Sequence, residues 1–144
     1  MRGSVLRHVF VFVLVGLTAT ACSSSTIVMP TPTPPSVTEP PFTGTLTLNG
    51  AVTYAFVAAA AGTVTVSLTS LTPDSTLLVG LSLGVWNATS GTCSVNNTIQ
   101  NTSATQGTVL SALTTVASNL CVQVFDAHGD VPTAETFTVI IVHP

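Results

Sequence analysis

Asp126, His128 and Asp130 are the side chains of the sequence whose types and spacing best suit metal binding. Two carboxylates and an imidazole within one short segment supply the oxygen and nitrogen ligands that divalent cations take. The same pattern, Asp-x-x-Gly-Asp, is also ordinary turn chemistry, in which aspartate caps backbone amides and Gly129 takes a positive φ. We expect the turn, with the three residues as an alternative metal site.

A catalytic role is not expected for this chain. After residue 22 the sequence has two histidines, His128 and the penultimate residue His143, and it contains no His-Glu-x-x-His motif. A hydrolase would need a nucleophile with a base, a pair of carboxylates or a metal cluster. We therefore predict no enzymatic activity and no cofactor.

Cys22 follows a segment with the layout of a secretory signal peptide. Arg2 and Arg7 precede an apolar run over residues 9–17, and the small residues of 18–21 come next. The apolar run is shorter than the roughly 20 residues that a bilayer-spanning helix needs. We therefore expect a cleaved leader rather than the alternative, a permanent transmembrane anchor.

The segment Ala19-Thr20-Ala21-Cys22 resembles the lipobox of bacterial lipoproteins, in which the cysteine thiol takes diacylglycerol before cleavage. The resemblance implies a signal peptide over residues 1–21 and a mature chain anchored in the cell envelope through lipid on Cys22. Ser23 brings no acidic retention signal, which favours the outer membrane if the cell is Gram-negative. Because Ala19 replaces the commonest leucine and the same residues suit ordinary signal peptidase, simple secretion is the alternative.

Cys93 and Cys121 remain as a pair once Cys22 carries lipid. Three cysteines would leave an exported protein with one odd thiol, and acylation of Cys22 removes it. We therefore predict a disulfide between Cys93 and Cys121, with two separate buried thiols as the alternative. Metal binding by the pair is not expected, because neither residue has Cys-x-x-Cys spacing.

Proline and charge divide the rest of the chain. Residues 22–41 are rich in Ser, Thr and Pro, which predicts an extended linker, so a single folded domain is expected over residues 42–144.

Lysine is absent and both arginines precede Cys22, whereas the five acidic side chains all follow it. A mature surface without these cations cannot release counterions from phosphates, so nucleic acid is excluded as a partner. Contact with a membrane is expected only through the lipid anchor.

Alternation of apolar and polar residues from position 42 onward predicts half-buried strands. Leu46 and Leu48 are expected on one face of a first strand, and Asn49-Gly50 predicts a hairpin turn to a return strand over residues 54–58. Two further apolar faces follow the same period, namely Val64, Val66 and Leu68, and then Leu77, Val79, Leu81, Leu83 and Val85. Gly80 and Gly84 on the other face of the later strand indicate a bulge or a close neighbour.

The second half of the domain gives weaker signals. Residues 87–106 are polar and poorly periodic, which predicts a long loop with one short strand near 95–99. A strand is expected over 108–116, and residues 120–125 and 137–142 are expected to form a final hairpin. These elements together predict an all-β fold, a small antiparallel β-sandwich of the jelly-roll type.

The domain resembles the bacterial pre-peptidase C-terminal domain, a small sandwich found at the ends of secreted proteases and in other exported proteins. The matching features cover the domain from end to end: Phe42-x-Gly44, Asn49-Gly50, Tyr54-x-Phe56-x-Ala58, Gly62-x-Val64-x-Val66-x-Leu68, Asp74 before the 77–85 strand, Val122-x-Val124 and Phe137-x-Val139. Ser75 and Thr76 stand where the family has a second acidic residue, and Ser118-Asn119-Leu120 where it has Gly-x-Tyr. A calcium role is therefore not carried over from relatives.

A surface-anchored, non-enzymatic interaction or structural module is the function that these features favour, with a protein or a polysaccharide as its partner. The uncharged edge strands also allow the domain to associate with itself or with a β-edge of a partner. The alternative is a carbohydrate-binding domain, in which Trp86 and Tyr54 form an aromatic platform for sugars. A calcium-stabilised domain is a third possibility.

Overall fold

Threonine and serine alternate with apolar residues through most of the domain, and in the structure these stretches are strands. The structure, a computed structural model, describes residues 32–132 and 134–144, apart from the side chains of residues 96–98. The predicted signal peptide and Cys22, the predicted lipidation site, lie outside the described residues. The strands are β1 (Val37–Thr38), β2 (Phe42–Leu46), β3 (Ala51–Ala58), β4 (Gly62–Thr72), β5 (Val79–Asn87), β6 (Thr92–Ala104), β7 (Val109–Thr114), β8 (Ser118–Phe125) and β9 (Glu135–His143).

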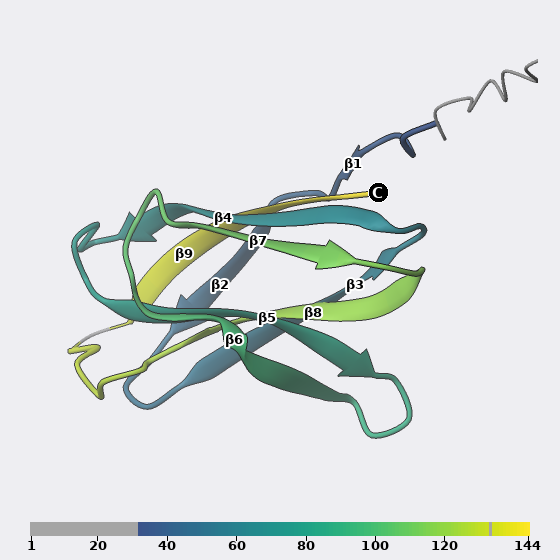
Figure 1. The fold of residues 1–144 in the computed structure, drawn as a ribbon. Helices are drawn as coiled ribbons and strands as arrows, with labels where there is room; N and C mark the ends of the chain where they lie inside the picture. The colour runs from purple at the N-terminus through teal and green to yellow at the C-terminus, as the bar shows by residue number, and fades with distance from the viewer. Residues whose placement is uncertain (1–31, 133) are drawn as a thin grey trace, which may run out of the picture. The chain divides into compact units, whose positions relative to one another are not determined.

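Two antiparallel sheets pack face to face, which confirms the predicted β-sandwich. Sheet A has the order β1-β9-β4-β7, and β2 pairs with β9 on the same edge as β1. Sheet B has the order β3-β8-β5-β6. Figure 1 shows the two layers, with β4, β7 and β9 in one and β3, β5, β6 and β8 in the other. The described part of the chain contains no helix of the length and apolarity that a membrane crossing requires.

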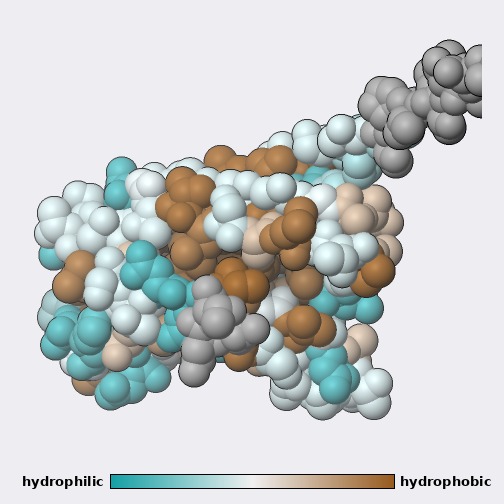
Figure 2. Space-filling model, viewed as in Figure 1, coloured by the Kyte–Doolittle hydropathy of each residue, from teal (hydrophilic) through white to brown (hydrophobic). Residues whose placement is uncertain are grey.

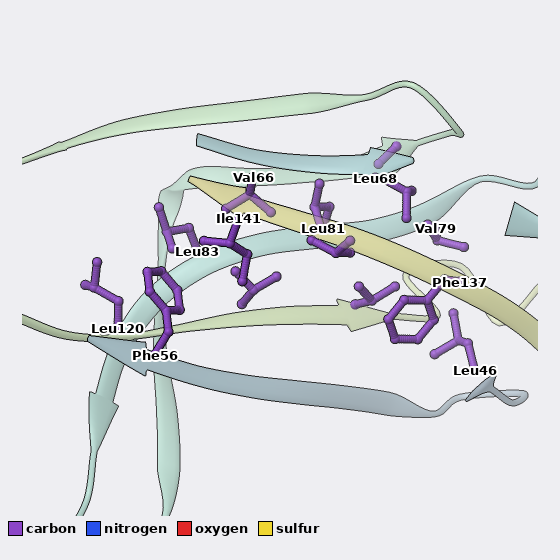
Figure 3. Close-up of a cluster of buried hydrophobic side chains, with 14 of the residues drawn as sticks. Leu46, Phe56, Val66, Leu68, Val79, Leu81, Leu83, Leu120, Phe137 and Ile141 are labelled. Atoms are coloured by element: carbon purple, nitrogen blue, oxygen red, sulfur yellow. The ribbon is translucent and has the colours of Figure 1, made fainter. Parts of the chain in front are cut away.

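The core lies between the sheets and is made by alternate residues that face inward from both sheets, as Figure 3 shows. Val64, Val66 and Leu68 of β4 are buried as the alternation predicts. Complete burial of one such aliphatic side chain is worth about 1.5 to 3 kcal/mol, so this repeated pattern is the main source of stability. The other large buried side chains include Leu46, Phe56, Val79, Leu81, Leu83, Leu120, Phe137 and Ile141.

The first predicted hairpin is wrong, although its turn is present. The amide of Gly50 donates to the carbonyl oxygen of Thr47 at 2.8 Å, and Asn49 has a φ of 53°. The turn connects β2 in sheet A with β3 in sheet B, so the chain passes between sheets at this point. Leu46 is buried, but Leu48 is 58% exposed because the strand ends before it.

The predicted final hairpin is also wrong. β8 pairs with β3 and β5 in sheet B, whereas β9 pairs with β2 and β4 in sheet A. Both strands exist close to the predicted bounds, but the long connection across Asp126–Asp130 carries the chain from one layer to the other. A connection of this length is not restricted to neighbouring strands, which is why adjacency in sequence misled the prediction.

The predicted long loop over residues 87–106 is wrong as well, because β6 occupies most of it and forms a hairpin with β5; the short strand expected near 95–99 is only the middle of β6. The register shifts between Ser82, which pairs with Gln100, and Gly84, which pairs with Val95. This bulge explains why the sequence shows no continuous period. The predicted strand over 108–116 is present as β7.

The sandwich begins before residue 42. Val37 and Thr38 pair with His143 and Val142, and the amide of Glu39 donates to the carbonyl oxygen of Ile141 at 2.9 Å. The last residues of the stretch expected to be a linker therefore form an edge strand of sheet A. The C-terminal end of β9 thus pairs with the segment that precedes residue 42.

Candidate functional site

An apolar groove opens between the two sheets on the side where β6 and β7 form their edges. We call it the β6–β7 groove; its volume is about 250 Å³ and every residue that lines it is uncharged. Its apolar lining comes from both sheets and includes Val64, Leu83, Ile99, Ala112, Leu113 and Leu120. In Figure 2 apolar side chains gather on this face, between β7 and the β5–β6 hairpin.

Small residues create the β6–β7 groove. Ala112 faces inward from β7, and Ser94 of β6 and Ser118 of β8 line the opposite wall. Because side chains in protein cores fill their space closely, small residues at facing positions leave room for an added group. The groove is thus a gap in the core that is open to solvent.

The rim of the groove is apolar and exposed. Val116 is 62% exposed and Val85 is 59% exposed, and Leu113, which borders the groove from the outer face of β7, is 73% exposed. The prediction that Val85 belongs to the core is wrong. Its side chain faces inward, opposite Leu120, but it lies at the open side of the sandwich and is therefore exposed. Such a cluster around a concave surface is typical of a binding site.

The other side of the sandwich is closed by aromatic rings. Phe42 stacks on Tyr54 with ring centroids 4.8 Å apart and meets the edge of Phe137 at 5.5 Å. These contacts bring β2, β3 and β9 together and fill the space between the sheets there. The two sides therefore differ, and apolar surface is open on the β6–β7 side.

Tyr54 belongs to the core side of β3 and not to a sugar platform. It packs against the core, and its hydroxyl donates to Oε2 of Glu39 at 3.3 Å. Burial and the negative charge of Glu39 raise the pKa of Tyr54 above its ordinary value.

Trp86 is half-buried and follows the inward-facing Val85, so it projects from the opposite face of sheet B. The structure does not bring the two rings together.

Glu39 also holds His143. Its Oε1 lies 2.9 Å from Nε2 of His143, which is almost completely buried beside the ring of Phe56. This polar cluster joins β1, β3 and the end of β9. His143 is therefore an ordered part of the fold.

Asp126 organises the turn that the sequence predicted. Its carboxylate accepts hydrogen bonds from the amides of Asn49 and Gly129 at 2.9 Å and of Asp130 at 3.1 Å. Partial burial raises the pKa of Asp126, but these bonds and one from Val131 outweigh it, and the net pKa is below its ordinary value. The Asp126 oxygens are thus occupied by backbone amides.

The other two candidate metal ligands point elsewhere. Nε2 of His128 lies 2.7 Å from the carbonyl oxygen of Thr102, and Asp130 is exposed. Across the described residues, no three His, Cys, Asp or Glu side chains are grouped so that they could hold a metal ion. Gly129 has a φ of 73°, the positive value that the predicted turn requires.

Cys93 and Cys121 form the predicted disulfide, with their Cα atoms 5.8 Å apart. Cys93 is on β6 and Cys121 is on β8, yet β5 lies between these strands in sheet B. The start of β6 must therefore bend across β5. Gly84 permits this, because a Cβ at that position would overlap the carbonyl group of Ser94.

The sequence expectations missed one pattern, Gly80-x-Ser82-x-Gly84, which has the residue spacing of a hydrolase nucleophile elbow. An elbow requires a sharp turn from a strand into a helix, with the serine exposed. Ser82 instead lies within the extended strand β5, is completely buried, and donates weakly to the carbonyl oxygen of Gln123 at 3.5 Å. The glycines serve packing, since the ring of Phe125 lies directly over Gly80.

Comparison with known proteins adds no family name: no protein-family model and no curated protein matches the chain. The likeness to pre-peptidase C-terminal domains rests on the sequence motifs, and the function must be argued from the site.

Proposed function

We propose that this chain is a lipid-anchored, non-enzymatic module that displays its β-sandwich at the cell envelope for interaction with another macromolecule. The β6–β7 groove carries the proposal, because it exposes core-like apolar surface on one side of an otherwise well-packed domain. Exposed apolar surface around a hollow costs stability in a monomer and is usually retained for binding.

The polar groups of the domain support a non-catalytic role. Asp126 is engaged with backbone amides, Glu39 with His143, and Ser82 with its neighbouring strand. The structure gives no specific support to sugar binding on Tyr54 and Trp86, since the two rings lie on opposite faces of sheet B.

The anchor part of the proposal rests on Cys22 and the residues before it. We expect the chain in the membrane fraction of its host and the Cys22→Ser variant in the soluble exported fraction. The double variant Cys93→Ala/Cys121→Ala is the matched control, since it loses two other cysteines but keeps the anchor and should stay with the membrane. Equal fractionation of the chain and Cys22→Ser would refute lipid anchoring.

A further inference from the structure

β7 offers a free strand edge beside the groove. It pairs with β4 on one side, and its other edge has no partner strand in the described part of the chain. Residues 108–116 contain no proline and no charged residue. Natural sheets usually protect an exposed edge with lysine, proline, a bulge or a very short strand, and β7 has none of these.

The other sheet edges differ from β7: β1 and β2 share the far edge of sheet A, and β3 and β6 form the two edges of sheet B. β1 has two residues and is followed by Pro40 and Pro41. β6 is interrupted by a bulge opposite Leu83. β2 and β3 are also edge strands, but on their side of the sandwich the rings of Phe42 and Tyr54 close the space between the sheets. Only β7 combines a regular edge with an open apolar groove among the described strands.

The backbone groups of three β7 residues face the free edge. The carbonyl oxygen of Thr108 accepts a hydrogen bond from the amide of Leu68 on β4 at 2.9 Å. Because the direction of backbone hydrogen bonding alternates along a strand, Val109, Ser111 and Leu113 direct their N–H and C=O groups away from β4. These six groups are available to an added antiparallel strand.

We infer that the partner of this edge is β7 of a second copy of the chain, paired antiparallel about a two-fold axis at Ser111. This register sets Val109 opposite Leu113 of the second copy, and Leu113 opposite its Val109. Val109 and Leu113 are 55% and 73% exposed on the outer face, so the pairing covers two apolar side chains of each copy. The interface is self-complementary, as two-fold symmetry requires.

The same register fits the inner face. Leu110 of the second copy then lies opposite Ala112, whose small side chain borders the β6–β7 groove. Leu110 packs partly against its own core, and its exposed part thus borders the hollow beside Ala112 of the other copy, twice in the dimer. The register that pairs the exposed outer side chains therefore also directs Leu110 towards the groove.

Charge favours a second copy as well. The five acidic side chains of the mature chain lie outside β7 and outside the residues that line the groove, so the two copies meet without like-charge repulsion there. A charged ligand would find no counter-charge in this groove. Pairing of the two six-residue β7 strands buries only a small interface, and interfaces of that size typically associate weakly.

This inference rests on the proposed function, because anchoring in one membrane raises the effective concentration of the copies. The test uses the full chain in host membranes. Ser111→Cys places two thiols on the two-fold axis, with Cα atoms about 5.5 Å apart, within the range of a disulfide. Thr65→Cys is the matched control, since Thr65 is the β4 partner of Ser111 and lies about 14 Å from its copy in the dimer.

We expect mild oxidation to give disulfide-linked dimer with Ser111→Cys and about tenfold less with Thr65→Cys. Adding Leu113→Lys to Ser111→Cys should lower the dimer yield about tenfold, because an edge lysine opposes pairing, whereas Leu48→Lys, at an exposed leucine outside the edge, should not. Equal yields from Ser111→Cys and Thr65→Cys, or no effect of Leu113→Lys, would overturn self-pairing. Fractionation of the same samples tests anchoring separately, so membrane-bound chain without specific cross-linking refutes only the pairing.

Discussion

Gly84 lies against the backbone of Ser94 so closely that a Cβ at position 84 would overlap the Ser94 carbonyl group and stand 3.1 Å from Cα of Val95. The contact lets β6 cross β5, and Cys93 thereby reaches Cys121 on β8. One glycine, one bulge and one disulfide therefore shape the edge of sheet B beside the groove.

Gly84→Ala should destabilise the domain by about 1 to 3 kcal/mol, since the added methyl group meets rigid backbone. Urea denaturation of the purified chain measures the loss. Gly91→Asn is the control, because Gly91 has open space around it and a φ of 64°, which asparagine tolerates. A Gly84→Ala midpoint at or above that of the unchanged chain would contradict the close approach.

Loss of the disulfide should cost about 3 to 4 kcal/mol in the chain-entropy model, because the bond closes a loop between residues 28 apart in sequence. Cys93→Ala/Cys121→Ala and the chain treated with reductant should show the same lowered midpoint in chemical denaturation. If reductant left the midpoint of the unchanged chain where it is, the bridge would play no part in stability.

Asp126→Asn should lower stability at neutral pH by about 1 kcal/mol, since the amide is a weaker acceptor and the site is partly solvated. The pKa of Asp126 is lowered in the folded chain, so its contribution is present above pH about 4 and is lost as the pH falls further. Denaturation at several pH values should show that the free energy of unfolding of Asp126→Asn falls less between neutral and acid pH than that of the unchanged chain. Asp130→Asn removes the same charge from the same turn, and an equal effect there would disprove the capping role.

Glu39→Ala should release β1 while leaving the rest of the sandwich folded. The side chain binds both Tyr54 and His143, and the two-residue strand has little other support. Hydrogen exchange of the backbone amide at position 39, which donates to Ile141, should become faster by about tenfold, whereas amides of β4 should exchange as before. Unchanged exchange at Glu39 would show that strand pairing alone holds β1.

The sequence predicted the layers of the domain better than their connections. Alternation placed Val64, Val66 and Leu68 in the core correctly because one-sided burial imposes a period of two. The Asn49-Gly50 turn was predicted, but turn chemistry is local and does not determine which sheet the next strand joins.

Only a short strand near 95–99 was predicted where β6 runs over 92–104, because an edge strand with a bulge between Val95 and Gln100 has no continuous buried face. The groove was not predictable either. It arises where the small residues Ser94, Ala112 and Ser118 come together from three strands, and single-strand patterns contain no signal of such a gap. The pair Cys93 and Cys121 was predicted from parity, which does not depend on topology.

Intact mass of the protein extracted from its native host, with and without reductant, tests lipid anchoring and the bridge together. We expect a chain that begins at Cys22, carries the added mass of lipid and gains two hydrogens on reduction. An unlipidated chain would contradict the proposed anchor, and a mass that reductant leaves unchanged would contradict the disulfide.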